Sequence, residues 1–182
     1  MRRLVLLAAA CVAATTAACG KGSKTPVVAT PGIADSADQV LFHTRTVLAN
    51  NGIQRAELFS DTTFVLDNQT RFDLRRVKLN FTKDNGAPNG TMVADHGVYN
   101  LNSRILEGWG DVVITLVDGR TLKSPHVIYN QPLNQLSSDT TYSLSNGDRT
   151  ATGIGFNADP GFTHYQCLRQ CGGSAIVTIP AR

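Results

Sequence analysis

The chain has 182 residues, of which 42% are hydrophobic and 17% are charged, so it is long and apolar enough for one folded domain. Removing Arg2 and Arg3, which belong to an expected leader, from the 17 basic residues leaves 15 against 14 acidic ones. This balance gives no support for nucleic-acid binding, which requires a clustered basic face.

The first residues have the pattern of an export signal. Met1-Arg2-Arg3 is positively charged, and Leu4 to Ala14 is apolar. Thr16-Ala17-Ala18-Cys19 resembles the junction of bacterial lipoproteins, so we predict a signal peptide over residues 1–18 and lipidation of Cys19. A plain secretory signal cleaved nearby is the alternative. Residues 19–38 are rich in Lys, Ser, Thr, Pro and Gly and are expected to form a flexible tether.

From Gln39 onward the side chains alternate between apolar and polar, which predicts β-strands. Asn50-Asn51-Gly52 and Asp67-Asn68-Gln69 have the composition of turns, and residues 83–90 are expected to form a loop. A short helix beginning at Ser36 is a competing interpretation of the first segment. The strands expected here cover residues 39–48, 53–66 and 71–82.

Residues 91–144 contain an internal repeat. His96-Gly97-Val98-Tyr99-Asn100 returns thirty positions later as His126-Val127-Ile128-Tyr129-Asn130. Leu106 to Val117 alternates with period two, and Asp118-Gly119 is typical of a hairpin turn. A repeat of this size cannot bury its own apolar face, so several units must stack. The sequence therefore predicts an all-β sandwich, barrel or roll.

Four segments stand out by their order and spacing. They are Gly52-Ile53-Gln54-Arg55-Ala56-Glu57-Leu58, Ala94-Asp95-x-Gly97-x-Tyr99, Leu106-Glu107-Gly108-x-Gly110-Asp111-Val112 and Gly153-Ile154-Gly155-Phe156-x-x-Asp159. Together they resemble the LptC family and its OstA-like relatives. This resemblance implies a β-jellyroll of stacked antiparallel strands over residues 39–160, V-shaped and partly open. It also implies a non-enzymatic periplasmic protein of lipopolysaccharide transport, which passes acyl chains of this or a similar glycolipid along an apolar groove.

The partners implied by the resemblance are inner-membrane ABC transporter subunits and an OstA-like periplasmic bridge protein. A lipid anchor would hold the chain to a membrane, with the inner membrane favoured and the outer membrane as the alternative. The alternative function is an OstA-like bridge or a lipoprotein chaperone in outer-membrane biogenesis. No cofactor is expected.

The inward apolar faces are the expected lipid-lining surface; without the resemblance, the same pattern would indicate a closed core. Ile114 lies in the middle of this stripe, whereas Thr115 should face outward. The expected lining residues are Leu58, Phe64, Leu66, Val77, Leu79, Phe81, Tyr99, Leu106, Val112, Ile114, Leu116, Ile128, Tyr142 and Leu144.

Residues 161–182 are expected to form a tail that carries Cys167 and Cys171. A disulfide is favoured for an exported protein, with free thiols or a metal site that includes His164 as alternatives. Residues 175–179 could add a last strand. His96 and His126 occupy matching repeat positions, which indicates a polar strand face rather than a metal pair. Gly153-Ile154-Gly155 is expected to mark a bulge or a close backbone approach.

Overall fold

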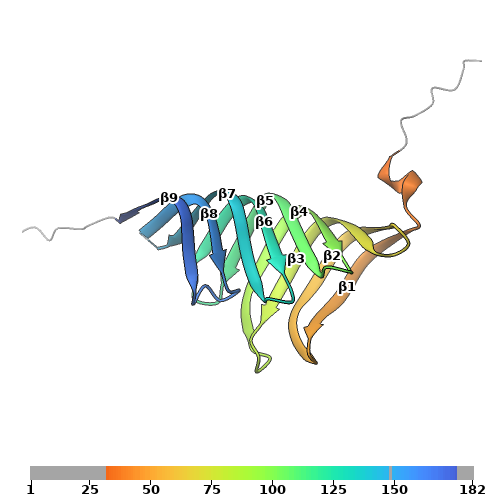
Figure 1. Cartoon of the computed structure of the whole chain (residues 1–182), viewed down its shortest axis with the longest axis horizontal. Coiled ribbons are helices and arrows are strands. Elements are labelled where there is room, and N and C mark those ends of the chain that lie inside the picture. Colours follow the sequence, from red (N-terminus) through yellow and green to blue (C-terminus); the bar gives the residue numbers. More distant parts are fainter. Residues whose placement is uncertain (1–31, 148, 176–182) are drawn as a thin grey trace, which may run out of the picture. The chain divides into compact units, whose positions relative to one another are not determined.

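The computed structural model describes residues 32–147 and 149–175. These residues form one antiparallel sheet in which nine strands follow each other in chain order (Figure 1). A single turn of 3-10 helix, η1 (Ile33–Ser36), precedes the sheet. The strands are β1 (Gln39–Asn50), β2 (Ile53–Leu66), β3 (Arg71–Thr82), β4 (Pro88–Asn100), β5 (Ile105–Leu116), β6 (Thr121–Asn130), β7 (Gln135–Asn146), β8 (Arg149–Ala158) and β9 (Tyr165–Ala175).

The all-β class and the strand interpretation of the segment from Gln39 are confirmed. The sheet continues past residue 160, because β9 lies in the segment that we expected to be a tail. The signal peptide, Cys19 and most of the tether lie outside the described residues. So does the part of the expected last strand that follows Ala175.

A line of irregular pairing, which we call the crease, crosses all nine strands. At the crease the ladder is interrupted between neighbouring strands, and several residues adopt positive φ, among them Asp111 at 47° and Gly155 at 73°. Such bulges bend strands, so the sheet folds over along this line. From β1 to β9 the crease residues are His43, Asp61, Arg76, Asp95, Asp111, Pro125, Asp139, Gly155 and Gln170.

The crease divides every strand between two halves of the sheet. Half A contains the β1–β2, β3–β4, β5–β6 and β7–β8 turns, and half B contains the β2–β3, β4–β5, β6–β7 and β8–β9 turns. The halves pack face to face: the ring of Phe81 in half A lies 5.2 Å from the ring of Tyr129 in half B, edge to face. This contact lies in the hydrophobic core.

The crease also changes which residues point inward. In β2 the buried positions change from Ser60 to Thr63, three residues apart, so the alternation reverses its phase. Phe64 consequently lies outside the core, with the guanidinium carbon of Arg75 5.5 Å from its ring centre. Leu66 is buried but also lies outside the core cluster.

The same reversal occurs in β6, where Ser124 and Val127 are both buried. Val127 and Tyr129 therefore occupy the inward positions, and Ile128 between them is half-buried and outside the core. Our inward assignment of Phe64 and Ile128 is corrected for this reason.

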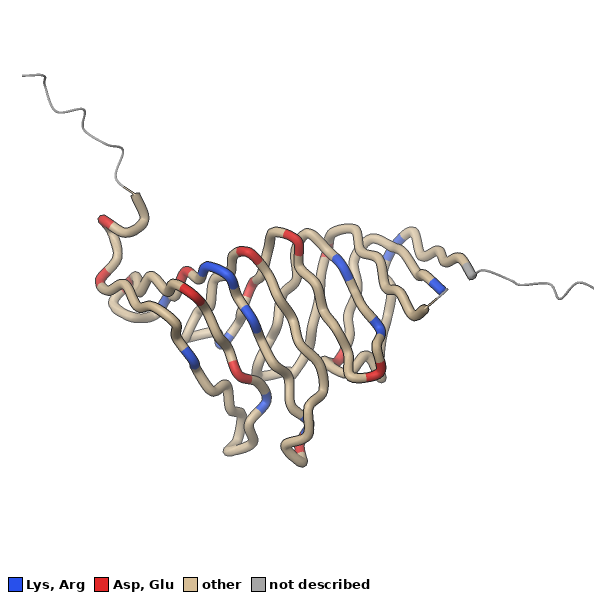
Figure 2. The backbone as a smooth tube through the Cα atoms, turned by 180° about the vertical axis from the view of Figure 1, so that it is seen from behind, with Lys and Arg blue, Asp and Glu red and all other residues tan. Residues whose placement is uncertain are grey.

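Charged residues of both signs are interleaved along the strands (Figure 2). Asp61, at the crease of β2, contacts Arg76 of β3 and lies 3.4 Å from Nδ1 of His43 in β1. The hydrogen bond from Arg76 is the main cause that lowers the pKa of Asp61. These charges tie the bends of three neighbouring strands together.

Candidate lipid groove at the β1 end of the sheet

The interior of the central strands is tightly filled. Leu79, Met92 and Ile114 have no exposed surface. Ten of the residues expected to line the lipid path belong to this core, and Leu144 packs against it. The ten are Leu58, Val77, Leu79, Phe81, Tyr99, Leu106, Val112, Ile114, Leu116 and Tyr142.

The packing is looser at the β1 end of the sheet. Leu48 is the only residue of β1 that is buried, and Leu41 retains 42% of its surface. Leu41 pairs with Thr63, and Thr46 pairs with Leu58, so both face the interior side. Apart from Leu48, the inner face of β1 is thus largely exposed, although it carries the apolar side chain of Leu41.

A groove of about 340 Å³ lies here, and we call it the β1 groove. Its volume is at the lower end of the range for small-molecule sites, and most of its wall is aliphatic or aromatic. Such a wall suits a hydrocarbon chain. The lining residues are Leu41, Thr44, Arg45, Thr46, Leu58, Thr63, Phe72, Leu74, Tyr99 and Leu101.

Three hydroxyl groups meet where the β1 groove reaches the crease. Thr44 Oγ1 lies 3.0 Å from Ser60 Oγ and 2.9 Å from Thr63 Oγ1, and the last two are 2.6 Å apart. Each hydroxyl is therefore hydrogen-bonded to the others. A buried polar group with a partner carries little desolvation cost, so this cluster is compatible with an apolar ligand beside it.

Gln131 lies beside the groove, where it is hydrogen-bonded to the lining residue Tyr99. It is 2% exposed, and its Nε2 donates to the carbonyl of Ala49 at 2.8 Å. Its Oε1 accepts from the hydroxyl of Tyr99 at 2.9 Å, and its backbone N–H donates to the carbonyl of Arg104. Burial raises the pKa of the Tyr99 hydroxyl, which keeps this donor protonated.

These bonds join the end of β1 in half A to the β6–β7 turn in half B. Asn50 Nδ2 adds a bond of 3.1 Å to the carbonyl of Pro132 in the same turn. The sequence analysis missed Gln131, because its position beside Pro132 is typical of a solvent-exposed turn. No signal in a single sequence distinguishes it from such a residue.

The sheet order makes β1 and β9 the two edge strands of the described residues. The outer face of β1 carries apolar side chains, with Phe42 69% and Val47 52% exposed. An edge strand offers unpaired backbone groups to another strand.

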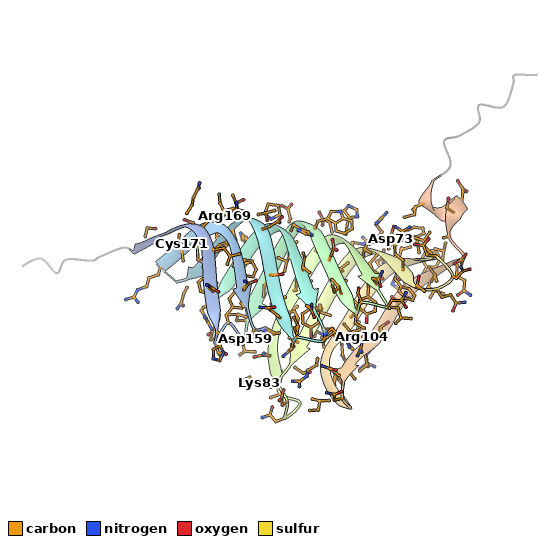
Figure 3. All side chains as sticks on the ribbon, in the orientation of Figure 1. Asp73, Lys83, Arg104, Asp159, Arg169 and Cys171 are labelled. Atoms are coloured by element: carbon orange, nitrogen blue, oxygen red, sulfur yellow. A yellow bond between two sulfur atoms is a disulfide. The ribbon has the colours of Figure 1, made fainter. Side chains whose placement is uncertain are left out.

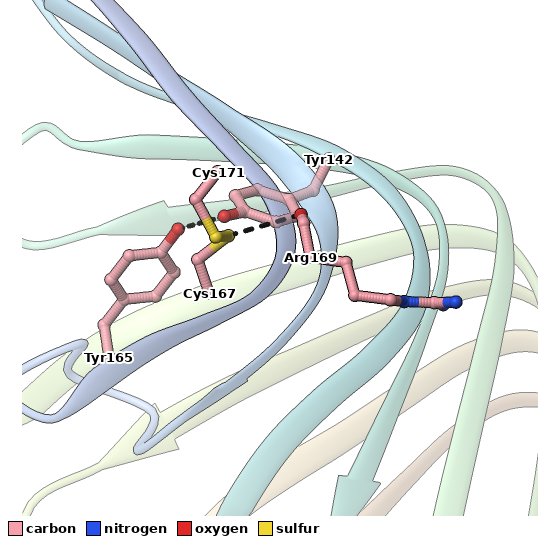
Figure 4. The surroundings of a disulfide bond; sticks show 5 residues. All are labelled: Tyr142, Tyr165, Cys167, Arg169 and Cys171. Carbon is pink, nitrogen blue, oxygen red and sulfur yellow. Dashed lines mark hydrogen bonds between the residues drawn. A yellow bond between two sulfur atoms is a disulfide. The ribbon is translucent and has the colours of Figure 1, made fainter.

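Cys167 and Cys171 are joined by a disulfide that spans the bend of β9 (Figure 4). Their Cα atoms are 6.0 Å apart, whereas a regular strand would separate them by about 13 Å. The neighbouring hydroxyls of Tyr142 and Tyr165 are hydrogen-bonded. A Cβ at Gly153 would lie 2.7 Å from the Cys167 sulfur. Gly153 is thus a close backbone approach, and Gly155, with its positive φ, is part of the bend.

The four histidines of the chain do not meet. His96 and His126 pair with Trp109 from opposite sides, so they stand two strands apart. Nδ1 of His164 lies 3.7 Å from Asp159. Across residues 32–147 and 149–175, no three His, Cys, Asp or Glu side chains gather closely enough to hold a metal ion.

No curated protein sequence matches the chain. Among solved structures, it is similar to LptH of Pseudomonas aeruginosa, described as the LptA homologous periplasmic component of the lipopolysaccharide transport device. The identity is 11% and the TM-score 0.49, over 69% of this chain and 95% of that one.

Within the described part of the chain, no helix has the length and apolar character needed to cross a membrane. The family model described as "Lipopolysaccharide-assembly, LptC-related" matches residues 4–160. This match extends over most of the chain, from the predicted leader to the β8–β9 loop, and the chain therefore belongs to the LptC-related family of lipopolysaccharide assembly.

Proposed function

We propose that the chain is a non-enzymatic periplasmic carrier that holds acyl chains of lipopolysaccharide or a similar glycolipid. It would receive them from an inner-membrane ABC transporter and deliver them to a periplasmic bridge protein. The observation that carries the proposal is the β1 groove, an apolar opening at an edge strand of a sheet whose centre is packed.

Burial of hydrocarbon in the groove would supply the driving free energy for such a role. Each CH₂ group removed from water contributes about 0.8 kcal/mol, so ten methylenes contribute about 8 kcal/mol before the cost of ordering the chain. The edge of β1 beside the groove could pair with a strand of a neighbouring jellyroll. Such pairing would place two grooves end to end.

Further transfer requires the core to open, because Ile114 is fully buried. We infer that acyl chains enter at the β1 groove and then part the two halves of the sheet. This opening would separate pairs such as Phe81 and Tyr129, which touch across the interior.

Photocrosslinking tests this route with a matched pair in one strand. Leu41 lines the groove and is 42% exposed, whereas Val40 does not line it and is 37% exposed. A photoreactive side chain at position 41 should capture lipopolysaccharide during active export, and one at position 40 should not. Equal capture at both positions would contradict the proposal.

A second pair tests passage through the interior. Capture at position 114 together with its absence at position 115, which is exposed, would mean that the chains travel between the sheet halves. Capture at position 41 without capture at 114 would restrict the cargo to the β1 groove.

We also propose that Cys19 carries a lipid, which would hold the carrier at a membrane. The support is the Thr16-Ala17-Ala18-Cys19 junction and the polar segment after it. Mass spectrometry of the mature N-terminus should find a modified Cys19 as the first residue. A free amino terminus at another position would exclude this anchor.

A further inference from the structure

A second groove lies on the outer side of the crease, over β5, β6 and β7, and we call it the crease groove. Its volume is about 790 Å³, and it opens widely to solvent. The side chains that matter for its chemistry are Trp109, Asp111, Lys123, Thr141 and Ser143.

The crease groove results from missing strand pairing. In β5 the two residues Gly110 and Asp111 stand opposite the single residue Pro125. Between β6 and β7 the ladder stops after the pair Lys123 and Ser143 and resumes only at Ile128 and Ser137. A gap therefore opens in the sheet.

Internal hydrogen bonds hold this gap in place. Ser124 Oγ lies 3.0 Å from the carbonyls of both His126 and Thr141 and can donate its one proton to either, and Ser138 Oγ donates to the His126 carbonyl at 2.7 Å. Thr140 Oγ1 lies 3.0 Å from Ser124 Oγ. Backbone carbonyls that are not paired in the sheet thus accept hydrogen bonds from side-chain hydroxyls. This is expected of a stable structural feature, because buried backbone groups are normally hydrogen-bonded.

The polar groups at the mouth of the groove, unlike these hydroxyls, do not bond to other parts of the described chain. Among the described residues, the indole N–H of Trp109, the carboxylate of Asp111, the ammonium of Lys123 and the hydroxyl of Ser143 bond to no other protein group. Asp61, at the same crease, is by contrast paired with Arg76. The groove therefore presents donors and acceptors that are available to a ligand.

The charges in the groove balance, with one carboxylate and one ammonium beside the only tryptophan of the chain. A fatty chain would leave these polar groups without partners, and a phosphate would face Asp111. A sugar ring has an apolar C–H face for an aromatic ring and hydroxyls at its rim. These hydroxyls both donate and accept, as Asp111 and Lys123 require.

We propose that the crease groove binds a saccharide, with one sugar face on Trp109 and its hydroxyls bonded to Asp111 and Lys123. This site stands apart from the β1 groove, and it does not require acyl chains to bind there. The shared ligand chemistry has two sources, the sugar portion of a glycolipid or a free oligosaccharide, and the experiment separates them.

Trp109 emission reports on this groove alone, because the chain has no other tryptophan. The full-length protein is titrated with maltose, with lactose and with delipidated oligosaccharide released from lipopolysaccharide by mild acid. We expect a saturable emission change with at least one probe. A response to the delipidated oligosaccharide alone identifies the glycolipid as the source, whereas a response to a plain disaccharide identifies a general saccharide site.

Two variants test the assignment. Asp111→Asn preserves a residue type that tolerates the positive φ of this position but removes the charged acceptor, and it should weaken binding about tenfold. Lys123→Gln should weaken it similarly. Lys78→Gln, at an exposed lysine of β3 outside the groove, should bind as the wild type does.

The proposal is overturned if no probe gives a saturable change, or if Asp111→Asn and Lys123→Gln bind as tightly as Lys78→Gln. Circular dichroism checks that each variant is folded. Capture of lipid at position 41 is measured independently, so failure of the saccharide site and failure of the carrier function give different results.

Discussion

Gln131 and Ala49 are 82 residues apart in the chain, yet Nε2 of Gln131 donates to the carbonyl of Ala49 at 2.8 Å. The contact joins the two halves of the sheet beside the β1 groove. Together with the bond from Asn50 to the carbonyl of Pro132, it ties the end of β1 to the β6–β7 turn.

We expect Gln131→Ala to lower the free energy of unfolding by about 2–4 kcal/mol, because it leaves the Tyr99 hydroxyl and the Ala49 carbonyl without partners. Urea denaturation measures the loss. Hydrogen exchange should also increase at the end of β1. Gln135→Ala, at a half-buried position of β7, is the control and should lower the free energy of unfolding far less. Equal losses in the two variants would show that the bonds of Gln131 do not hold the two halves of the sheet together.

Two phenylalanines provide a test of the folded sheet. Phe81 is 1% exposed and contacts Tyr129, whereas Phe42 is 69% exposed. Phe81→Ala should destabilise the protein by about 3–5 kcal/mol, and Phe42→Ala should change its stability by less than about 0.5 kcal/mol. Thermal or urea unfolding of both variants measures these losses of stability. A similarly small loss in each variant would contradict the packing of half A on half B.

Asp159 should make the β8–β9 loop sensitive to acid (Figure 3). Burial acts to raise the pKa of this carboxyl, but hydrogen bonds from the His164 N–H, the Thr163 hydroxyl and the Gly161 N–H outweigh it and lower the pKa below its usual 3.8. The folded state therefore favours the carboxylate. Its contribution to stability is present above pH 3.8 and is lost as the pH falls through the lower folded pKa.

Unfolding of the wild type and of Asp159→Asn, measured from pH 6 to pH 3, tests this contribution. The variant should be less stable at pH 6, and the difference between the two proteins should shrink below about pH 4. A constant difference over the whole range would show that the ionised carboxylate contributes nothing.

The cysteine pair predicts a chemical result. Peptide mass spectrometry of the unreduced protein should find Cys167 and Cys171 linked, and thiol reagents should modify neither after denaturation. Reduction should loosen β9 near its bend, because the short cross-link holds the two sides of that bend together. Quantitative labelling of both sulfurs without a reductant would exclude the bridge.

The period-two pattern predicted most of the strands but not β9, and it predicted their inward faces only in part. In β5 the last buried residue before the crease is Gly108 and the first after it is Val112, four positions later. Because this interval is even, the same alternating positions face inward on both sides of the crease, and Ile114 faces inward as expected. In β2 and β6 the interval is odd, so Phe64 and Ile128 face the other way. In β2 and β6 the bend has no local sequence signal, whereas in β8 the Gly153-Ile154-Gly155 segment marked it.

The two grooves were less predictable than the strands. The β1 groove requires an end of the sheet where the inner face is left uncovered, and Gln131 acts through a partner that is 82 residues away. The crease groove depends on a gap in pairing between β6 and β7. Both grooves and the contact of Gln131 with Ala49 result from the way the sheet folds over at the crease. The alternation of apolar and polar residues does not determine this fold.

Strand order has a consequence for how the chain acquires its structure. Each strand pairs only with the strand before it and the strand after it, so every step of sheet growth closes a short loop. Such local contacts allow rapid folding, and strands can add one at a time as a chain emerges from a ribosome or a translocation channel. The bond between Gln131 and Ala49 must wait until β6 and the turn after it have been added, so this link between the two halves of the sheet forms late in folding.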